Sequence, residues 1–119
     1  MLIETISDKI KKLLELKKEG TYWDFKQSYP TDNLDLVYDI ICLANNLDNK
    51  DALLVYGVQD KTYELIGVDT DPNRKRQSDI LDLLRNGCSF ENGCYPRINV
   101  HTIQIEGCTL DAISIKHYI

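Results

Sequence analysis

Four charged side chains in the first half of the 119-residue sequence could act together: Glu19, Asp24, Lys26 and Asp60. Three converging carboxylates repel one another unless a cation lies between them, and hard oxygen ligands of this kind suit Mg²⁺ or Mn²⁺. Such a metal activates water and stabilises charge on a phosphoryl group. A lysine beside the metal can stabilise a pentacovalent phosphate or orient the attacking water. Many metal-dependent nucleases share the acid-x-Lys spacing, but an ion pair on a strand face is the alternative interpretation of so short a match.

Two predicted strands would bring these residues together. Residues 52–60 contain five large apolar residues without polar alternation, which predicts a central strand covered on both faces and ending at Asp60. Residues 23–26 alternate, so the tryptophan and phenylalanine would point inward while Asp24 and Lys26 point together the other way. If the two strands are neighbours, Asp24, Lys26 and Asp60 can meet in one place.

The remaining pattern predicts an α+β domain with a mixed, mostly antiparallel sheet of five or six short strands and helices packed on it. Amphipathic spacing and capping residues indicate the helices, and alternation with turn residues indicates the strands. The expected order is α-β-α-β-β-α-β-β. The first half contains a helix at 7–18, a strand at 23–26, a helix at 33–47 capped by Asp32, and a strand at 52–60. The second half contains a returning strand at 64–68, a helix started by Asp71-Pro72 and ended by Asn86-Gly87, and a hairpin of 97–105 and 108–115 around Glu106-Gly107.

Length and composition favour one soluble domain over residues 1–119, which leaves open that it is the N-terminal part of a longer protein. No apolar run approaches the roughly 18 residues that a membrane span requires. The acidic start of the chain does not resemble a secretory signal. The four cysteines include no Cys-x-x-Cys pair, which indicates reduced thiols and a cytoplasmic protein.

The net charge of −5 argues against broad nucleic-acid binding, yet the basic residues are clustered. One cluster lies on the first predicted helix, where a solvated outer face is the alternative to phosphate contacts. The clusters are Lys9, Lys11, Lys12, Lys17 and Lys18 in the first helix, and Arg74-Lys75-Arg76 further along.

The acidic residues also belong to a longer pattern. It runs from Glu19 to Asp24-Phe25-Lys26, then Ala44-Asn45 closing a helix, then Val55-Tyr56-Gly57-Val58-Gln59-Asp60, then Ile66-Gly67-Val68. In spacing and element order this pattern resembles the Schlafen-type divergent Alba (AlbA) domain, over about residues 19–115.

The resemblance implies an Alba/Schlafen-like fold and binding of RNA or DNA. In Schlafen proteins that cut tRNA and other RNAs, three acids hold a divalent metal; by position these fall on Glu19, Asp24 and Asp60, with Lys26 beside them. Two departures stand out. Asp24 replaces the more usual glutamate and shortens the reach by one methylene. A longer turn at residues 47–51 replaces the family's Gly-Gly, which puts backbone contact with a phosphate there in doubt.

Histidine and cysteine metal sites are not expected. The turn places His101 opposite Ala112 rather than beside His117, so no histidine pair is predicted. Cys88 and Cys94 have no histidine close to them in the sequence, which argues against zinc.

Other candidates are given structural roles. Cys42 lies in an apolar helix pattern and is expected to pack in the core. Gly57 and Gly67 form no phosphate-binding loop and are expected to permit close packing or a bulge. Three tyrosines beside the strands are of a type that can stack on bases, but a core role is the alternative: Tyr22, Tyr29 and Tyr56.

The sequence therefore leaves three hypotheses. In the first, the domain is a metal-dependent nuclease that uses Mg²⁺ or Mn²⁺. In the second, it binds RNA or DNA without cleaving it, through Lys26, Arg74, Lys75 and Arg76, and the acids are vestigial. In the third, it is a dimerising or regulatory module of a larger protein, with no membrane partner.

Overall fold

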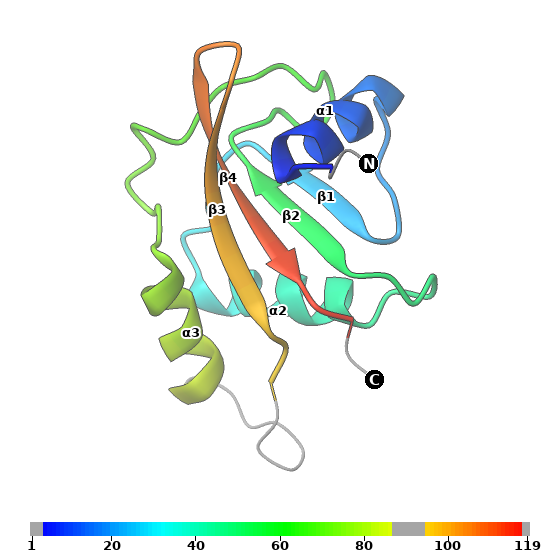
Figure 1. The fold of residues 1–119 in the computed structure, drawn as a ribbon. Helices are drawn as coiled ribbons and strands as arrows, with labels where there is room; N and C mark the ends of the chain where they lie inside the picture. Colours follow the sequence, from blue (N-terminus) through cyan, green and yellow to red (C-terminus); the bar gives the residue numbers. More distant parts are fainter. Residues whose placement is uncertain (1–3, 87–94, 118–119) are drawn as a thin grey trace.

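The computed structural model describes residues 4–86 and 95–117, which fold as one four-stranded sheet between layers of helix (Figure 1). The strand order is β1-β2-β4-β3, with β1 parallel to β2 and the other two pairs antiparallel. The sheet is thus mixed and mostly antiparallel, and the expected α+β class is confirmed. The elements are α1 (Ile6–Leu16), β1 (Trp23–Lys26), α2 (Asn33–Ala44), β2 (Ala52–Tyr56), α3 (Gln77–Asn86), β3 (Ile98–Ile105) and β4 (Cys108–Ile115).

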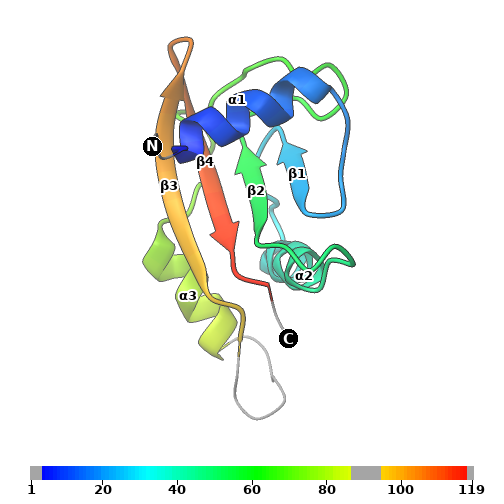
Figure 2. The same cartoon turned by 45° about the vertical axis from the view of Figure 1, so that its right-hand side comes forward.

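Strand β2 is central, as its uninterrupted apolar run predicts. All five of its residues are buried, because α1 covers one face of the sheet and α2 and α3 cover the other (Figure 2). Each face has its own apolar cluster: the α1 side includes Leu53 and Val55, and the α2 side includes Leu54 and Tyr56. A strand covered on both faces has no need of polar alternation.

The alternation of β1 sets the direction of its charged residues. Trp23 and Phe25 are buried in the cluster under α1. Asp24 and Lys26 therefore project to the opposite face, in register with Leu54 and Tyr56 of β2. This places both charged side chains on the α2 side of the sheet, at its β1 edge.

The segment after β2 differs from its prediction. Strand β2 ends at Tyr56 rather than at residue 60, and residues 64–68 form only an isolated bridge between Leu65 and Val58. The reason is a close backbone crossing: the Gly57 carbonyl accepts from the N–H groups of Ile66 and Gly67, at 2.7 and 2.9 Å. Both glycines have positive φ, 106° and 90°, which permits this turn. The expected close packing at these glycines is confirmed, and the sheet has four strands rather than five or six.

Two helix boundaries also differ. Helix α1 ends at Leu16 because Lys17 adopts a left-handed conformation (φ 48°). The third helix does not start at Asp71-Pro72: α3 begins at Gln77. The carboxylate of Asp71 is used elsewhere, since it accepts from the backbone N–H groups of Tyr29 and Asn73 at 2.7 and 2.9 Å.

The terminal hairpin forms as predicted. Its two turn residues, Glu106 and Gly107, have φ of 50° and 78°, as a type I′ turn requires, and His101 lies opposite Ala112. Helix α2 likewise begins after Asp32, whose side chain accepts from the Leu34 N–H, although it ends at Ala44. Within the described residues, every helix is too short or too polar to cross a membrane.

Candidate functional site

An ion pair lies at the end of β1. The Lys26 ammonium is 3.2 Å from a carboxylate oxygen of Asp24, and both side chains are partly exposed. Burial alone would lower the pKa of Lys26, but the carboxylates around it outweigh burial and raise it. The lysine is therefore held in its charged form beside acidic residues.

Glu19 joins this pair from the loop between α1 and β1. Its carboxyl group is close enough to Asp24, Lys26 and the backbone N–H of Phe25 for each of them to shift its pKa. Burial and the Asp24 carboxylate raise the pKa of Glu19 from 4.5 to about 7, against the opposing effects of Lys26 and the Phe25 N–H. Of the residues predicted to share the site, Glu19, Asp24 and Lys26 thus lie near one another at the end of β1.

Asp60 is placed differently. It is exposed in the turn that follows β2. Its charge and the charges of the other two acids all act on the pKa of Tyr63. Burial raises the pKa of Tyr63, and so do the charges of Glu19, Asp60 and Asp24, so that all three acids are electrostatic neighbours of this one phenol. Across residues 4–86 and 95–117, no group of three or more His, Cys, Asp or Glu side chains has the spacing of a preformed metal site. Glu19 and Asp24 lie near each other, but the predicted gathering of Glu19, Asp24 and Asp60 into one metal site is not present among the described residues.

A further acid at this site escaped the sequence analysis. Asp39 of α2 is partly buried, and burial raises its pKa, with opposing influence from Lys26 and a like-charge effect from Asp24. The charges of Asp24, Asp39 and Glu19 in turn raise the pKa of Lys26. Asp39 follows the buried Leu36 by three positions, so the same periodicity that predicts the buried face of α2 could have placed an acid beside it.

Two stacked tyrosine side chains, Tyr29 and Tyr56, lie in the core near these acids. Tyr56 is fully buried and its ring stacks on Tyr29, with centroids 4.1 Å apart. The Tyr56 hydroxyl is buried without a hydrogen-bond partner among the described residues. Burial raises its pKa, and so do the charges of Asp39, Asp24 and Asp71. A buried hydroxyl without a partner is uncommon in proteins and calls for a water, an ion or a ligand.

Arg74, the first residue of the basic segment 74–76, is committed to the fold. Arg74 donates from Nε and from a terminal nitrogen to the two carboxylate oxygens of Asp111, at 2.9 and 3.0 Å. Asp111 is 1% exposed and also accepts from the hydroxyls of Tyr29 and Thr102, each at 2.8 Å. Burial alone would raise the pKa of Asp111, but these hydrogen bonds outweigh it and lower the pKa.

Two other cations of this segment remain at the surface. Arg76 is exposed and lies 3.7 Å from Asp79 at the start of α3. The Lys75 ammonium makes no ion pair within the described part of the chain. Of the three basic residues that the sequence suggests for phosphate contacts, Lys75 and Arg76 thus stay available.

The other sequence candidates have these positions. Cys42 is exposed, so its predicted core role is wrong: it lies on the outer face of α2. His101 contacts Ser114 at 3.1 Å. Cys88 and Cys94 lie outside the described residues. Of the three tyrosines weighed for base stacking, Tyr29 and Tyr56 are buried in the core and Tyr22 is packed partly against it.

The acid pair fits a divalent cation in its donor chemistry. Glu19 and Asp24 are hard oxygen donors that lie near each other, and the pKa of Glu19 is raised first by burial and then by the neighbouring Asp24 carboxylate. Mg²⁺ is commonly bound by one or two protein carboxylates, with water and substrate phosphate as its other ligands. The two carboxylates next to Lys26 match the number and type of protein ligands that such a cation uses.

Comparison with known proteins identifies the family and a similar fold. Residues 19–118 match the family described as Schlafen, AlbA_2. No curated protein gives a significant match. Among solved structures, the DIP2311 protein from Corynebacterium diphtheriae has a similar fold, with a TM-score of 0.57 and 18% identity; the match covers 95% of this chain and 26% of that one. Since the family match begins at Glu19 and extends over most of the chain, the protein belongs to the Schlafen AlbA_2 family.

Proposed function

We propose that this domain binds RNA or DNA and hydrolyses phosphodiester bonds with the help of Mg²⁺ or Mn²⁺. The Schlafen AlbA_2 family fits a nucleic-acid-binding domain, and hydrolysis is the further step. The observation that carries it is the Glu19–Asp24 pair with Lys26 at 3.2 Å from Asp24. Two adjacent carboxylates next to a permanent cation are costly in isolation and become favourable when a divalent ion and a phosphate enter.

The chain's own residues have separate roles in this proposal. Glu19 and Asp24 would hold the metal, and Asp60 would approach from its exposed turn as a third ligand. Lys26 would contact a phosphate oxygen and stabilise the charge that grows on it as the attacking water adds. When bound, the metal supplies an activated water and charge neutralisation. Asp39 would keep Lys26 protonated and oriented from the α2 side.

Local charge has to compensate for the net charge of −5 if a polyanion is to bind. Lys26 lies at the acid site on β1, while Lys75 and Arg76 line a pocket with Val100 and Thr102 of β3 and Asp111 of β4. Arg74 is not counted among the phosphate contacts, because its guanidinium forms an ion pair with Asp111. Lys26, Lys75 and Arg76 are therefore the phosphate contacts of the proposal.

A binding module without catalysis is the second candidate. It is favoured by the lack of a three-ligand cluster among the described residues and by the turn at 45–51. There the buried Asn46 side chain bonds the backbone of Leu43 and Lys50. Such a module could also pair with a second copy of itself, and it would then form a concentration-dependent dimer.

One incubation series tests the proposal. Labelled RNA and DNA are mixed with purified protein in Mn²⁺, in Mg²⁺, and in Mn²⁺ followed by excess chelator. Metal-dependent cleavage that disappears with chelator and in Asp24→Asn supports the nuclease. The matched control is Asp35→Asn, which removes an exposed acid from the first turn of α2. Retarded complexes that are salt-sensitive and never cut would establish the binding module instead; neither cleavage nor a complex would overturn both.

A further inference from the structure

A pocket of about 350 Å³ lies on the α2 side of the sheet, where the start of α3 meets strands β3 and β4. Residues 74–77 form one side of it, and Val100, Thr102 and Asp111 form the other. Its volume is at the lower end of the range of about 300–1,000 Å³ that is typical of ligand sites. Three of the residues in its lining are basic, and among the described residues that line it Asp111 is the only acid. The pocket therefore favours an anionic ligand.

Lys75 and Arg76 are held in this pocket by anchors on either side of them. Before them, Arg74 donates to the two carboxylate oxygens of Asp111 at 2.9 and 3.0 Å. After them, the Gln77 side chain accepts from a backbone N–H of β3 at 2.9 Å. Arg74 and Asp111 neutralise each other, so Lys75 and Arg76 supply the net positive charge of the pocket. Arg74 is a positioning residue here rather than a contact.

The pocket and the acid site share one row of the sheet. Lys26 of β1 pairs with Tyr56 of β2, and Tyr56 pairs with Asp111 of β4. Asp111 in turn pairs with Thr102 of β3. Tyr56 belongs to the apolar cluster on the α2 side, and residues paired across neighbouring strands point to the same face. Because neighbouring strands lie about 4.8 Å apart, the backbone of Lys26 is roughly 10 Å from that of Asp111 and roughly 15 Å from that of Thr102.

Tyr29 connects the two sites beneath this row. Its ring stacks on Tyr56, with centroids 4.1 Å apart, and its hydroxyl donates to Asp111 at 2.8 Å. Both tyrosines are buried, so they support the row from the core and leave the charged groups to contact a ligand. The sheet and this buried packing therefore fix the separation between Lys26 and the pocket.

A phosphate group suits the donors of the pocket. Lys75 offers an ammonium group, and Arg76 offers a planar fork of N–H donors that matches phosphate oxygens. Arg76 also lies 3.7 Å from Asp79, but its side chain is 86% exposed, so solvent weakens that pair. Arg76 can therefore exchange Asp79 for a phosphate at little cost.

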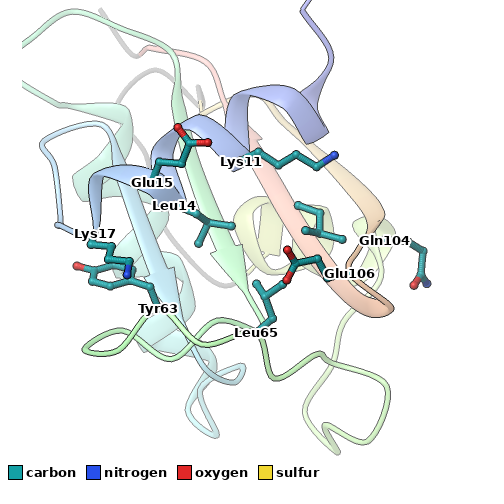
Figure 3. A pocket seen from close by; sticks show the side chains of 9 residues that line it. Lys11, Leu14, Glu15, Lys17, Tyr63, Leu65, Gln104 and Glu106 are labelled. Atoms are coloured by element: carbon teal, nitrogen blue, oxygen red, sulfur yellow. The ribbon is translucent and has the colours of Figure 1, made fainter.

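The groove on the opposite face of the sheet has balanced charges. It lies between α1, the turn after β2 and the tip of the β3–β4 hairpin, and Lys11 and Lys17 in its lining are matched by Glu15 and Glu106 (Figure 3). A phosphate in that groove would meet two carboxylates as well as two lysines. The pocket on the α2 side, which shares its face with Lys26, is therefore the better place for a polyanion.

We propose that this pocket holds a second phosphate of the same nucleic-acid strand whose reacting phosphate lies beside Lys26, so that the strand crosses the sheet from β1 towards β3. This rests on the proposed function, which supplies the phosphate at the acid site. Two contacts on one strand act as linked binding sites, so the pocket adds affinity only when the strand is long enough to reach both. The domain thus selects strands of a minimum length.

The test measures binding by fluorescence anisotropy with single strands of RNA and DNA, from dinucleotides to dodecanucleotides, over a series of salt concentrations. Ca²⁺ replaces Mn²⁺ as a divalent oxygen-binding cation. The pocket variant combines Lys75→Gln with Arg76→Gln and leaves Asp111 and its partners unchanged. The matched control combines Lys11→Gln with Lys17→Gln, which removes the same charge from the groove on the α1 face.

The expected result depends on strand length. On the longer strands the pocket variant should bind about tenfold weaker than wild type, and the slope of log K against log salt should be smaller by about 0.7 for the lost phosphate contact. On dinucleotides, which reach only the acid site, the pocket variant should bind as wild type does. The control should stay within about twofold of wild type at every length, because salt screens charges on the far face.

The outcomes separate the two proposals. Equal losses in the pocket variant and the control on long strands would overturn the pocket and leave the proposed function intact. A loss on dinucleotides as large as that on long strands would overturn the shared strand. Binding of no strand by the wild-type protein would overturn both proposals. Should the pocket variant fail to fold, Arg76→Gln alone, at a side chain 86% exposed, provides the same comparison.

Discussion

Replacing Glu19 by glutamine is expected to stabilise the domain above neutral pH. The Glu19 carboxyl has a pKa of about 7 in the folded protein, raised by burial and by Asp24, against an ordinary value of 4.5. Glutamine keeps a side-chain oxygen and gains an N–H₂ group that can donate to Asp24. It removes the charge that Asp24 opposes.

The sign follows from proton linkage. The folded protein holds the Glu19 proton more tightly than the unfolded chain, so this group favours folding below pH 4.5. That contribution is lost as the pH rises through about 7. At 1.36 kcal/mol per pKa unit the full difference would be about 3 kcal/mol. Because Glu19 is exposed to solvent, we discount this to about 1–2 kcal/mol at pH 8, and to a few tenths near pH 5.

Urea unfolding followed by circular dichroism at pH 5 and pH 8 measures this difference. The matched control is Glu64→Gln, which removes an exposed glutamate from the turn after β2. The control should change the free energy of unfolding by the same small amount at both pH values. A Glu19→Gln protein that is no more stable than wild type at pH 8, or equally stabilised at both pH values, would refute the raised pKa of Glu19 on which this prediction depends.

Three further substitutions test other parts of the structure. Asp111→Asn should cost about 2–4 kcal/mol in urea unfolding, because Arg74 and two hydroxyls lose a buried carboxylate; a cost under about 1 kcal/mol would contradict its central role. Tyr56→Phe should raise stability by about 1 kcal/mol if its hydroxyl is unpartnered, and a loss would reveal a bound water or ion. Gly57→Ala should lower the thermal midpoint by the equivalent of about 2 kcal/mol or more. Its Cβ would lie 2.8 Å from Leu110 at a φ of 106°, so an unchanged midpoint would contradict this account.

Local periodicity predicted the parts of the fold that short-range chemistry determines. Alternation over residues 23–26 indicated which β1 side chains point to α2, and the Glu106-Gly107 turn fixed the register that sets His101 against Ala112. The same alternation placed Asp24 beside Lys26. These are consequences of a two-residue period and a two-residue turn, and they need no knowledge of distant contacts.

Long-range partners decided the features that the sequence analysis missed. Asp71 had the pattern of a helix cap, but Tyr29, 42 positions earlier, donates its N–H to that carboxylate. Arg74 had the pattern of a phosphate contact, but it meets Asp111, 37 positions later. Asp39 reaches the site only because α2 packs on the β1 side of the sheet. Residues this far apart in the sequence meet through the tertiary fold, which periodicity alone does not specify.

The most direct test of the central claim is a titration of the protein with Mn²⁺ by isothermal calorimetry at pH 8, with no nucleic acid present. We predict one bound ion per chain, with binding lost in Asp24→Asn and weakened in Glu19→Gln, while Glu64→Gln binds as wild type does. Binding that persists unchanged in Asp24→Asn, or no binding at millimolar Mn²⁺, would contradict the assignment of Glu19 and Asp24 as a divalent-cation site.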